Sequence, residues 1–151
     1  MARMYLDLNV YNRPFDDQMQ ARIRLETSAI LILFASLESG QHEGCWSFVL
    51  DYENGRNPVV DRSATIQRLA QVCGHAVVPS EAIRRLAHAL TEASNITAMD
   101  SLHLACANLG GCDYFVTCDD KLVKQAQRLL QDGHIRVRAV NPVDLIREEM
   151  S

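Results

Sequence analysis

The sequence has no apolar run long enough to cross a bilayer, which takes about 20 residues. Its most apolar helical stretch, residues 29–35, is short and has Glu26 and Glu38 on its flanks. No basic stretch leads into an apolar one near the N-terminus, so we expect no secretory signal. Repeats, low-complexity tracts and linkers are also missing, and 151 residues with 48% hydrophobic composition suit one full core. We therefore predict a single cytoplasmic domain, residues 1–151, with no membrane partner.

Closely spaced metal-binding cysteines are also absent. The five cysteines form no C-x-x-C pair, and the five histidines are scattered along the chain. Structural zinc sites are built from closely spaced pairs of Cys and His ligands. We therefore expect no zinc centre, and we interpret the cysteines as reduced, mostly buried thiols of a cytoplasmic protein.

The chain has no surplus of positive charge, and its formal net charge is -4. This argues against nonspecific binding of nucleic acid through bulk charge. It does not exclude an enzyme that acts on nucleic acid, because divalent cations would neutralise carboxylates clustered at one site. The remaining surface can then still carry a local basic rim.

Short apolar stretches alternate with helical patterns along the whole chain. We expect strands at residues 4–10, 45–49, 113–118 and 135–140. We expect helices at residues 17–38, 62–73, 81–93, 98–109 and 120–131, and a last one from Pro142. Strands separated by helices predict an α/β fold with a central parallel sheet flanked by helices. On the long helix, we expect Ile30 and Phe34 to pack in the core, with a dimer interface as the alternative.

Two aspartates lie where strands are expected to end. Asp7 interrupts the stretch 4–10, although Asp is depleted in strands and a buried charge is costly unless paired or bound to a metal. Asp119 follows the apolar stretch 114–118, just where a helix should begin. Ligands of parallel sheets bind outside the carboxyl ends of the strands, so both aspartates indicate one site at that edge.

Each candidate acid also has a simpler interpretation. Asp100 follows Thr97 at the T-x-x-D spacing of a capping box. Asp119 suits a helix N-cap, and Glu53 can lie solvated on the surface. Asp7 is the hardest of the four to explain without a function.

If these four acids lie close together, bound cations would stabilise their negative charge. Two carboxylates about 4 Å apart repel by roughly 4 kcal/mol at an effective dielectric near 20. Oxygen ligands suit Mg²⁺ or Mn²⁺, which activate water and stabilise an in-line phosphoryl displacement. This chemistry predicts hydrolysis of phosphodiesters or phosphomonoesters.

Four segments together resemble the motifs of the PIN-domain ribonucleases, and the resemblance covers nearly the whole chain. Residues 5–17 are similar to a first-strand D-x-N motif that continues with N-R-P-F-D-D, and residues 47–53 resemble the stretch that supplies the family's glutamate. Residues 98–107 resemble its D-x-L-H-x-A helix, and residues 115–120 its T-x-D strand end. One departure is Leu8, where the family commonly has a small hydroxyl residue; the change removes a supporting hydrogen bond but no ligand.

The resemblance implies a PIN-like fold and a Mg²⁺- or Mn²⁺-dependent endoribonuclease that hydrolyses RNA phosphodiester bonds. It assigns catalysis and metal binding to four acids, Asp7, Glu53, Asp100 and Asp119. Asn9 and Thr117 are then supporting residues, and Asp120 is an alternate or helper for Asp119. Many relatives are toxin halves of VapBC-type toxin–antitoxin pairs and form homodimers. The implied partners are therefore RNA, a cognate antitoxin and a second copy of the chain.

Further residues near the predicted site have less specific signals. Arg13, Arg56 and Lys121 lie near its expected mouth and are candidate contacts for RNA phosphates, with surface solvation as the alternative. His103 lies one helical turn after Asp100. We expect it to pack beside the helix start, with general-base catalysis as the alternative.

Two other functions compete with the ribonuclease. A HAD-like phosphohydrolase also has an Asp at the end of its first strand, but such enzymes usually carry a second Asp where this chain has Asn9. A catalytically inactive PIN-fold module that binds RNA or protein is the non-enzymatic alternative. The presence of all four acids argues against such a loss of activity.

Overall fold

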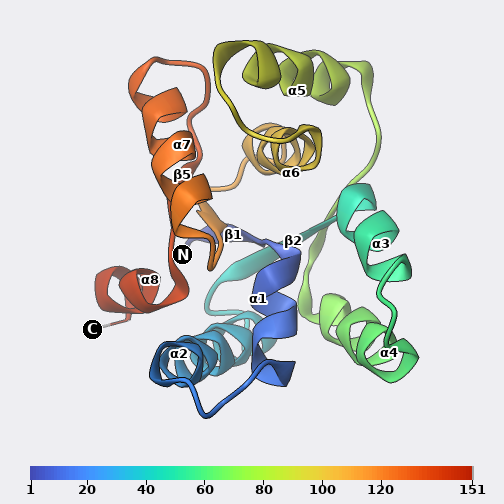
Figure 1. The fold of residues 1–151 in the computed structure, drawn as a ribbon, viewed down its shortest axis with the longest axis vertical. Helices are drawn as coiled ribbons and strands as arrows, with labels where there is room; N and C mark the ends of the chain where they lie inside the picture. Colours follow the sequence, from blue (N-terminus) through green and yellow to red (C-terminus); the bar gives the residue numbers. More distant parts are fainter. Residues whose placement is uncertain (151) are drawn as a thin grey trace.

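The computed structural model describes residues 1–150, with helices on both faces of a central sheet (Figure 1). The five strands are β1 (Arg3–Leu6), β2 (Glu43–Ser47), β3 (His75–Val77), β4 (Tyr114–Val116) and β5 (Arg138–Val140). All pairings are parallel, in the order β3-β2-β1-β4-β5. The predicted α/β class with a central parallel sheet is therefore confirmed, and it is consistent with a PIN-like fold.

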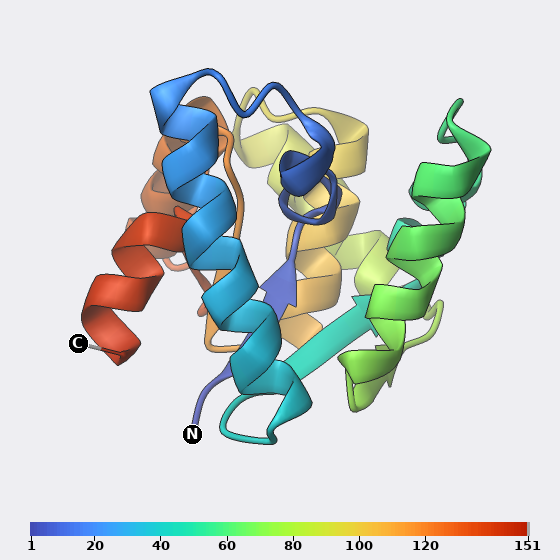
Figure 2. The same ribbon diagram turned by 90° about the horizontal axis from the view of Figure 1, so that it is seen from below.

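Eight α-helices lie within the described part of the chain. They are α1 (Leu8–Asn12), α2 (Ala21–Glu38), α3 (Phe48–Gly55), α4 (Val60–Leu69), α5 (Glu81–Ala93), α6 (Ala98–Leu109), α7 (Asp120–Gln131) and α8 (Pro142–Glu149). Two short 3-10 helices, η1 (Arg13–Phe15) and η2 (Ala70–Val72), follow α1 and α4. Helices α5 and α6 pack together on one side of the sheet, whereas α2 packs on α8 and crosses the other side (Figures 1 and 2).

The hydrophobic core is built around β1, the central strand. The side chains of residues 4–6 are fully buried, and the ring of Phe115 on β4 stacks on that of Tyr5 with centroids 5.6 Å apart. Helix α2 contributes Ile30 and Phe34 to the same core. Ile30 and Phe34 therefore pack in the core, as expected, and do not form the alternative dimer contact.

Helices α5, α6 and α7 have the predicted bounds. Each begins at a polar side chain, from Ser80, Thr97 or Asp119, whose oxygen accepts the N–H of the residue three positions later. Such caps satisfy backbone donors that have no partner inside the helix. Because this signal is local, the sequence alone was sufficient to place these helices.

The predicted strand over residues 4–10 is wrong beyond Leu6. Asp7 has an extended backbone (φ -60°, ψ 154°), and its Oδ1 accepts the N–H of Leu8 at 2.7 Å. This bond caps α1, so the chain leaves the sheet at Asp7. A short apolar run fits a buried strand and a buried helix equally well, which is why the pattern misled.

The second half of the expected strand 45–49 is also helical. Ser47 Oγ accepts the N–H of Leu50 at 3.2 Å and begins α3, which the sequence analysis did not predict. Strand β3 was also missed. The helix predicted at 62–73 runs from Val60 to Leu69 and continues as η2. The helix predicted from residue 17 begins at Ala21.

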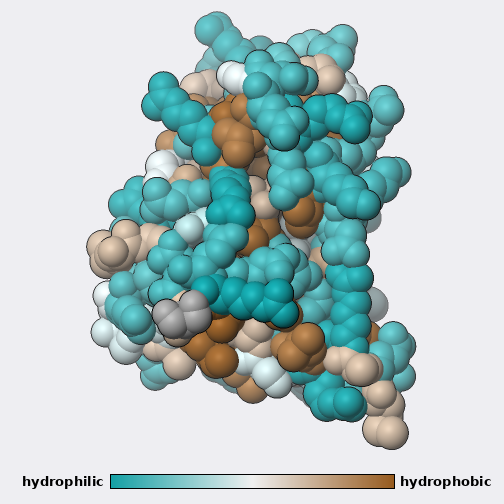
Figure 3. All heavy atoms as spheres, turned by 90° about the vertical axis from the view of Figure 1, so that its left-hand side faces the viewer, coloured by the Kyte–Doolittle hydropathy of each residue, from teal (hydrophilic) through white to brown (hydrophobic). Residues whose placement is uncertain are grey.

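The surface differs between faces of the molecule. The side formed by α7 and α8 is mainly hydrophilic, with hydrophobic residues in small separate patches (Figure 3). Helix α2 exposes Leu25, Leu31 and Ile32. Within residues 1–150, no helix combines the length and the apolarity needed to span a membrane.

Candidate active site

The site is centred on Asp7, which follows the central strand at its carboxyl end. Its side chain is buried and its two oxygens are used differently. Oδ1 accepts the Leu8 N–H, whereas Oδ2 accepts the Thr117 hydroxyl at 2.9 Å and the Asn9 amide at 3.3 Å. The Asn9 amide also donates to Thr117 Oγ1 at 3.0 Å, and Asn9 Oδ1 accepts the N–H of Cys118 at 3.1 Å. These bonds join the ends of β1 and β4 and hold Asp7 in one orientation.

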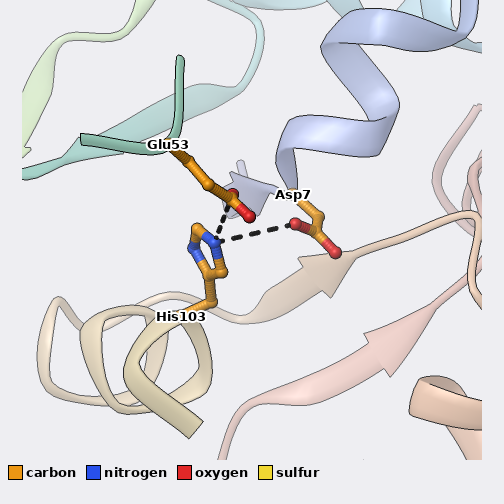
Figure 4. Close-up of side chains that lie close together, drawn as sticks. All are labelled: Asp7, Glu53 and His103. Carbon is orange, nitrogen blue, oxygen red and sulfur yellow. Dashed lines mark hydrogen bonds and ion pairs between the residues drawn. The ribbon is translucent and has the colours of Figure 1, made fainter. Parts of the chain in front are cut away.

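Glu53 reaches the same point from the last turn of α3. Its Oε1 lies 2.8 Å from Nε2 of His103 on α6, and that nitrogen is 4.0 Å from Asp7 Oδ1 (Figure 4). The other ring nitrogen of His103 lies 2.6 Å from the hydroxyl of Tyr5. Asp7, Glu53 and His103 thus converge from three different elements.

Asp100 and Asp119 lie at the starts of α6 and α7, outside the group of three residues whose ligand atoms lie within 4.8 Å of one another. Asp100 contributes to the raised pKa of Asp7, and Asp119 and Glu53 both contribute to the raised pKa of Asp100. Both also make the contacts of the simpler interpretation. The N–H of Asp100 donates to Thr97 Oγ1 at 3.1 Å, and Asp119 Oδ1 accepts the N–H of Leu122 at 3.2 Å. Capping and proximity to the acid group therefore coexist at both positions.

The pKa values follow from burial and from charges gathered at one place. The pKa of Asp7 is raised to about 6, chiefly by burial and also by the nearby charges of Asp100 and Glu53, whereas His103 and the Thr117 hydroxyl act to lower it. Burial also raises the pKa of Asp100. Burial lowers the pKa of His103, but the hydrogen bond to Glu53 and the surrounding carboxylates outweigh it and leave this pKa raised. The negative charge here is costly, so a cation would stabilise it.

The donor atoms fit a divalent metal ion. Asp7, Glu53 and His103 each offer one ligand atom, and these atoms lie within 4.8 Å of one another. Carboxylate oxygens are the ligands that Mg²⁺ and Mn²⁺ favour. This is the one such group of three or more that residues 1–150 contain, and it lies where ligands of parallel sheets bind.

The remaining predicted residues have other contacts. Asp120 forms an ion pair with Arg22 at 2.7 Å, and this hydrogen bond lowers the pKa of Asp120. Arg13 pairs with Asp16 at 3.2 Å and with the buried Glu26 at 3.3 Å. Their roles as a helper acid and as an RNA contact stay predictions.

Two further predicted RNA contacts lie on the surface. The guanidinium of Arg56 lies 5.5 Å from the ring centroid of Tyr52 and donates to its hydroxyl at 2.7 Å. Lys121 is exposed in the first turn of α7. Both side chains are exposed, so neither position is closed to a phosphate.

Sequence reasoning undervalued His103 and missed Tyr5 altogether. The D-x-L-H spacing drew attention to His103 but favoured simple packing, whereas the structure gives the ring a hydrogen-bonding partner on each nitrogen. Tyr5 lies inside an apolar strand, where an aromatic residue is ordinarily explained by packing. Only the contacts between distant segments distinguish these roles.

The chain resembles known proteins in its fold. No protein-family model matches the chain, and no curated protein matches it. Among solved structures, the crystal structure of FitAcB from Neisseria gonorrhoeae is similar, with a TM-score of 0.59 and 16% sequence identity. The similarity covers 92% of this chain and 97% of that one. At this identity the likeness shows a shared fold alone.

Proposed function

We propose that this protein is a metal-dependent endoribonuclease that hydrolyses RNA phosphodiester bonds. Its catalytic and metal-binding acids are Asp7, Glu53, Asp100 and Asp119. The observation that carries the proposal is the buried Asp7 carboxylate at the end of the central strand, with a second carboxylate, Glu53, facing it. The sequence resemblance to PIN-domain ribonucleases supports the substrate class, and the fold is consistent with it.

The acids and their neighbours have separate tasks in this proposal. Mg²⁺ or Mn²⁺, when bound, supplies an activated water and stabilises developing charge on the phosphate. Asp7 and Glu53 provide oxygen ligands, and Asp100 and Asp119 add negative charge beside them. Thr117 and Asn9 keep Asp7 in place by donating to its Oδ2.

The RNA backbone is expected to approach over the exposed cations of this edge. Lys121 and Arg56 are available for phosphate contacts, which add affinity without sequence preference. Arg13 fits a structural role better, because Glu26 and Asp16 already share its guanidinium.

The competing functions receive less support. A HAD-like phosphohydrolase needs a second acid where Asn9 stands, and the Asn9 amide here donates to Asp7 and Thr117. An inactive binding module has no need to keep several carboxylates around one buried aspartate, since their repulsion lowers stability. A ribonuclease, in contrast, needs these carboxylates to bind its metal ion.

The proposal is tested by RNA cleavage with defined metals. A labelled single-stranded RNA should be cut internally by the purified protein, the cutting should stop in EDTA, and Mg²⁺ or Mn²⁺ should restore it. Asp7→Asn should abolish cleavage, whereas Asp61→Asn, at an exposed residue of α4, should not. Cleavage that survives exhaustive chelation, or that appears only with zinc, overturns the proposal. Hydrolysis of a small phosphomonoester without RNA cleavage favours the HAD-like alternative.

We further infer a cytoplasmic toxin role with a cognate antitoxin and a homodimeric assembly, as the sequence resemblance implies. A small DNA-binding protein encoded beside this one is the expected antitoxin. Expression of the protein alone should arrest growth, and co-expression of that neighbour should relieve the arrest. Arrest that persists with the Asp7→Asn variant would separate any toxicity from the proposed site.

A further inference from the structure

We propose that Tyr5 and His103 form a clamp that fixes α3 at both ends and aims the Glu53 carboxylate at Asp7. His103 is then a positioning residue and not a metal ligand. The inference rests on the proposed function for the identity of the site, but its geometry stands independently of any activity. Three side chains of the clamp, Tyr5, Ser47 and His103, are almost completely buried.

The clamp is a continuous series of hydrogen bonds. Ser47 Oγ lies 2.7 Å from the Tyr5 hydroxyl, and that hydroxyl lies 2.6 Å from His103 Nδ1. His103 Nε2 then lies 2.8 Å from Glu53 Oε1. The first and last distances fall in the ordinary range for a hydrogen bond, and the 2.6 Å contact lies at its short end.

The directions of these bonds follow from the donors available. An ionised Glu53 carboxylate has no hydrogen, so the hydrogen of its contact with His103 is on Nε2. In the neutral ring, Nδ1 must then accept, and the Tyr5 hydroxyl donates to it. With the Tyr5 hydrogen directed to His103, Ser47 donates to the Tyr5 oxygen 2.7 Å away, while Ser47 Oγ accepts the N–H of Leu50. This arrangement satisfies every polar group in the series, and the hydrogen on Nε2 is the same in the protonated ring.

The two ends of the series lie on the same helix. Ser47 is the N-cap of α3, and Glu53 lies in its last turn. Between them the series passes through β1 at Tyr5 and through α6 at His103. A helix held at its first and last turns by two other elements has little freedom to rotate. Without the clamp, the Glu53 side chain, which is 32% exposed, would be free to swing into solvent.

The clamp also determines which atoms face a metal ion. A hydrogen on Nε2 leaves no lone pair there, so His103 cannot serve as a ligand while it holds Glu53. The ligands are then all oxygen, which suits Mg²⁺ or Mn²⁺ better than zinc. Partners of this kind commonly change metal affinity about 10–100-fold when they are removed.

The first experiment reads the protonation of the His103 nitrogens directly. In ¹⁵N-labelled unmodified protein without metal, NMR should show a hydrogen on Nε2, and Mg²⁺ should leave it there. Loss of that hydrogen on addition of Mg²⁺, or a neutral ring protonated on Nδ1 alone, overturns the proposal. This measurement needs neither RNA nor a variant that folds.

The second experiment measures Mn²⁺ affinity by calorimetry in variants that remove one group each. Tyr5→Phe deletes a hydroxyl that touches neither Asp7 nor Glu53, yet it should weaken Mn²⁺ binding. His103→Phe should weaken it about 10–100-fold. His103→Gln retains an N–H donor for Glu53 and should recover most of the affinity.

Matched controls separate the clamp from loss of stability alone. Tyr11→Phe removes another buried hydroxyl, which lies 3.4 Å from Cys73 Sγ, and His42→Phe removes another buried ring, which accepts the Ala2 N–H at 3.0 Å. Both controls should lower stability and leave Mn²⁺ affinity unchanged. Equal losses in Tyr5→Phe and Tyr11→Phe would overturn the clamp.

The proposed function and the clamp can fail separately. Absence of RNA cleavage, with the Mn²⁺ affinities ordered as above, refutes the nuclease and supports the clamp. Metal-dependent cleavage, with Mn²⁺ affinity unaltered in His103→Phe, supports the nuclease and refutes the clamp.

Discussion

The folded protein disfavours the ionised form of Asp7. Its pKa is raised from 3.8 to about 6, chiefly by burial. An acid with a raised pKa in the folded state stabilises that state only while protonated, so stability falls as pH rises between these values. For the metal-free protein this loss should be about 3 kcal/mol, complete above the folded-state pKa.

Substitution of Asp7 by Asn should remove this loss. In EDTA at pH 7.5, urea denaturation should give Asp7→Asn a higher free energy of unfolding than the parent. At pH 4 the two proteins should be nearly equal, because the parent carboxyl is then largely protonated. The same difference at both pH values would contradict the account of Asp7 as a buried charge.

Asp119 combines a cap with a proposed ligand, and two substitutions separate the roles. Asn caps a helix about as well as Asp, whereas Ala costs about 0.5–2 kcal/mol. Asp119→Asn should therefore keep the parent's stability in EDTA but lose metal-dependent cleavage. Asp119→Ala should lose both. An Asn variant with parental turnover and a parental response to Mg²⁺ would leave Asp119 with the capping role alone.

At the scale of elements, the buried Glu26 of α2 joins three parts of the fold. It pairs with Arg13 of η1 at 3.3 Å and with Arg22 at 3.5 Å, and it accepts the Asn141 amide at 2.6 Å beside α8. Arg13 and Arg22 keep their ion pairs with Asp16 and Asp120 when Glu26 is neutralised, so neither guanidinium is left without a partner. Glu26→Gln should therefore lower the free energy of unfolding by about 1–3 kcal/mol in urea denaturation, the cost of mispairing a buried polar group.

The control for Glu26 is an exposed ion pair. Asp144 faces Arg147 across one turn of α8, and both side chains are largely exposed. Asp144→Asn should change stability little, since solvent screens such pairs. A Glu26→Gln variant as stable as Asp144→Asn would show that this network does not hold α2 and α8 together.

At the scale of the whole molecule, metal binding should be visible as stability. A ligand that binds only the folded state adds about 2.7 kcal/mol at 100 times its Kd. Mg²⁺ should therefore raise the Tm of the parent in a thermal-shift experiment, and it should raise that of Asp7→Asn much less. Equal shifts would place the bound Mg²⁺ elsewhere on the protein.

The assembly is a second property of the whole molecule. Leu25, Leu31 and Ile32 are exposed on α2, and large apolar side chains gain from removal from water. We expect the implied homodimer to bury this surface, so light scattering should give a dimer mass that Leu31→Glu reduces. A monomer mass for the parent would contradict the prediction.

The sequence by itself determined the class of the fold and the order of most elements, although α1, α3 and β3 were not predicted. Helices α5, α6 and α7 were placed because their caps and apolar periodicity lie within a few residues of one another. It also marked Asp7, because a carboxylate inside an apolar stretch calls for a compensating partner wherever it lies.

Only the tertiary structure decided how the carboxylates are held. Asp7 caps α1 through its Oδ1, and Thr117, which is 110 positions away, donates to its Oδ2 and holds the carboxylate in place. The sequence pattern fitted a continued strand equally well. Glu53 meets His103 across 50 positions, and Tyr5 meets His103 across 98. Contacts of this range depend on how the strands pair and the helices pack, and no local propensity encodes them.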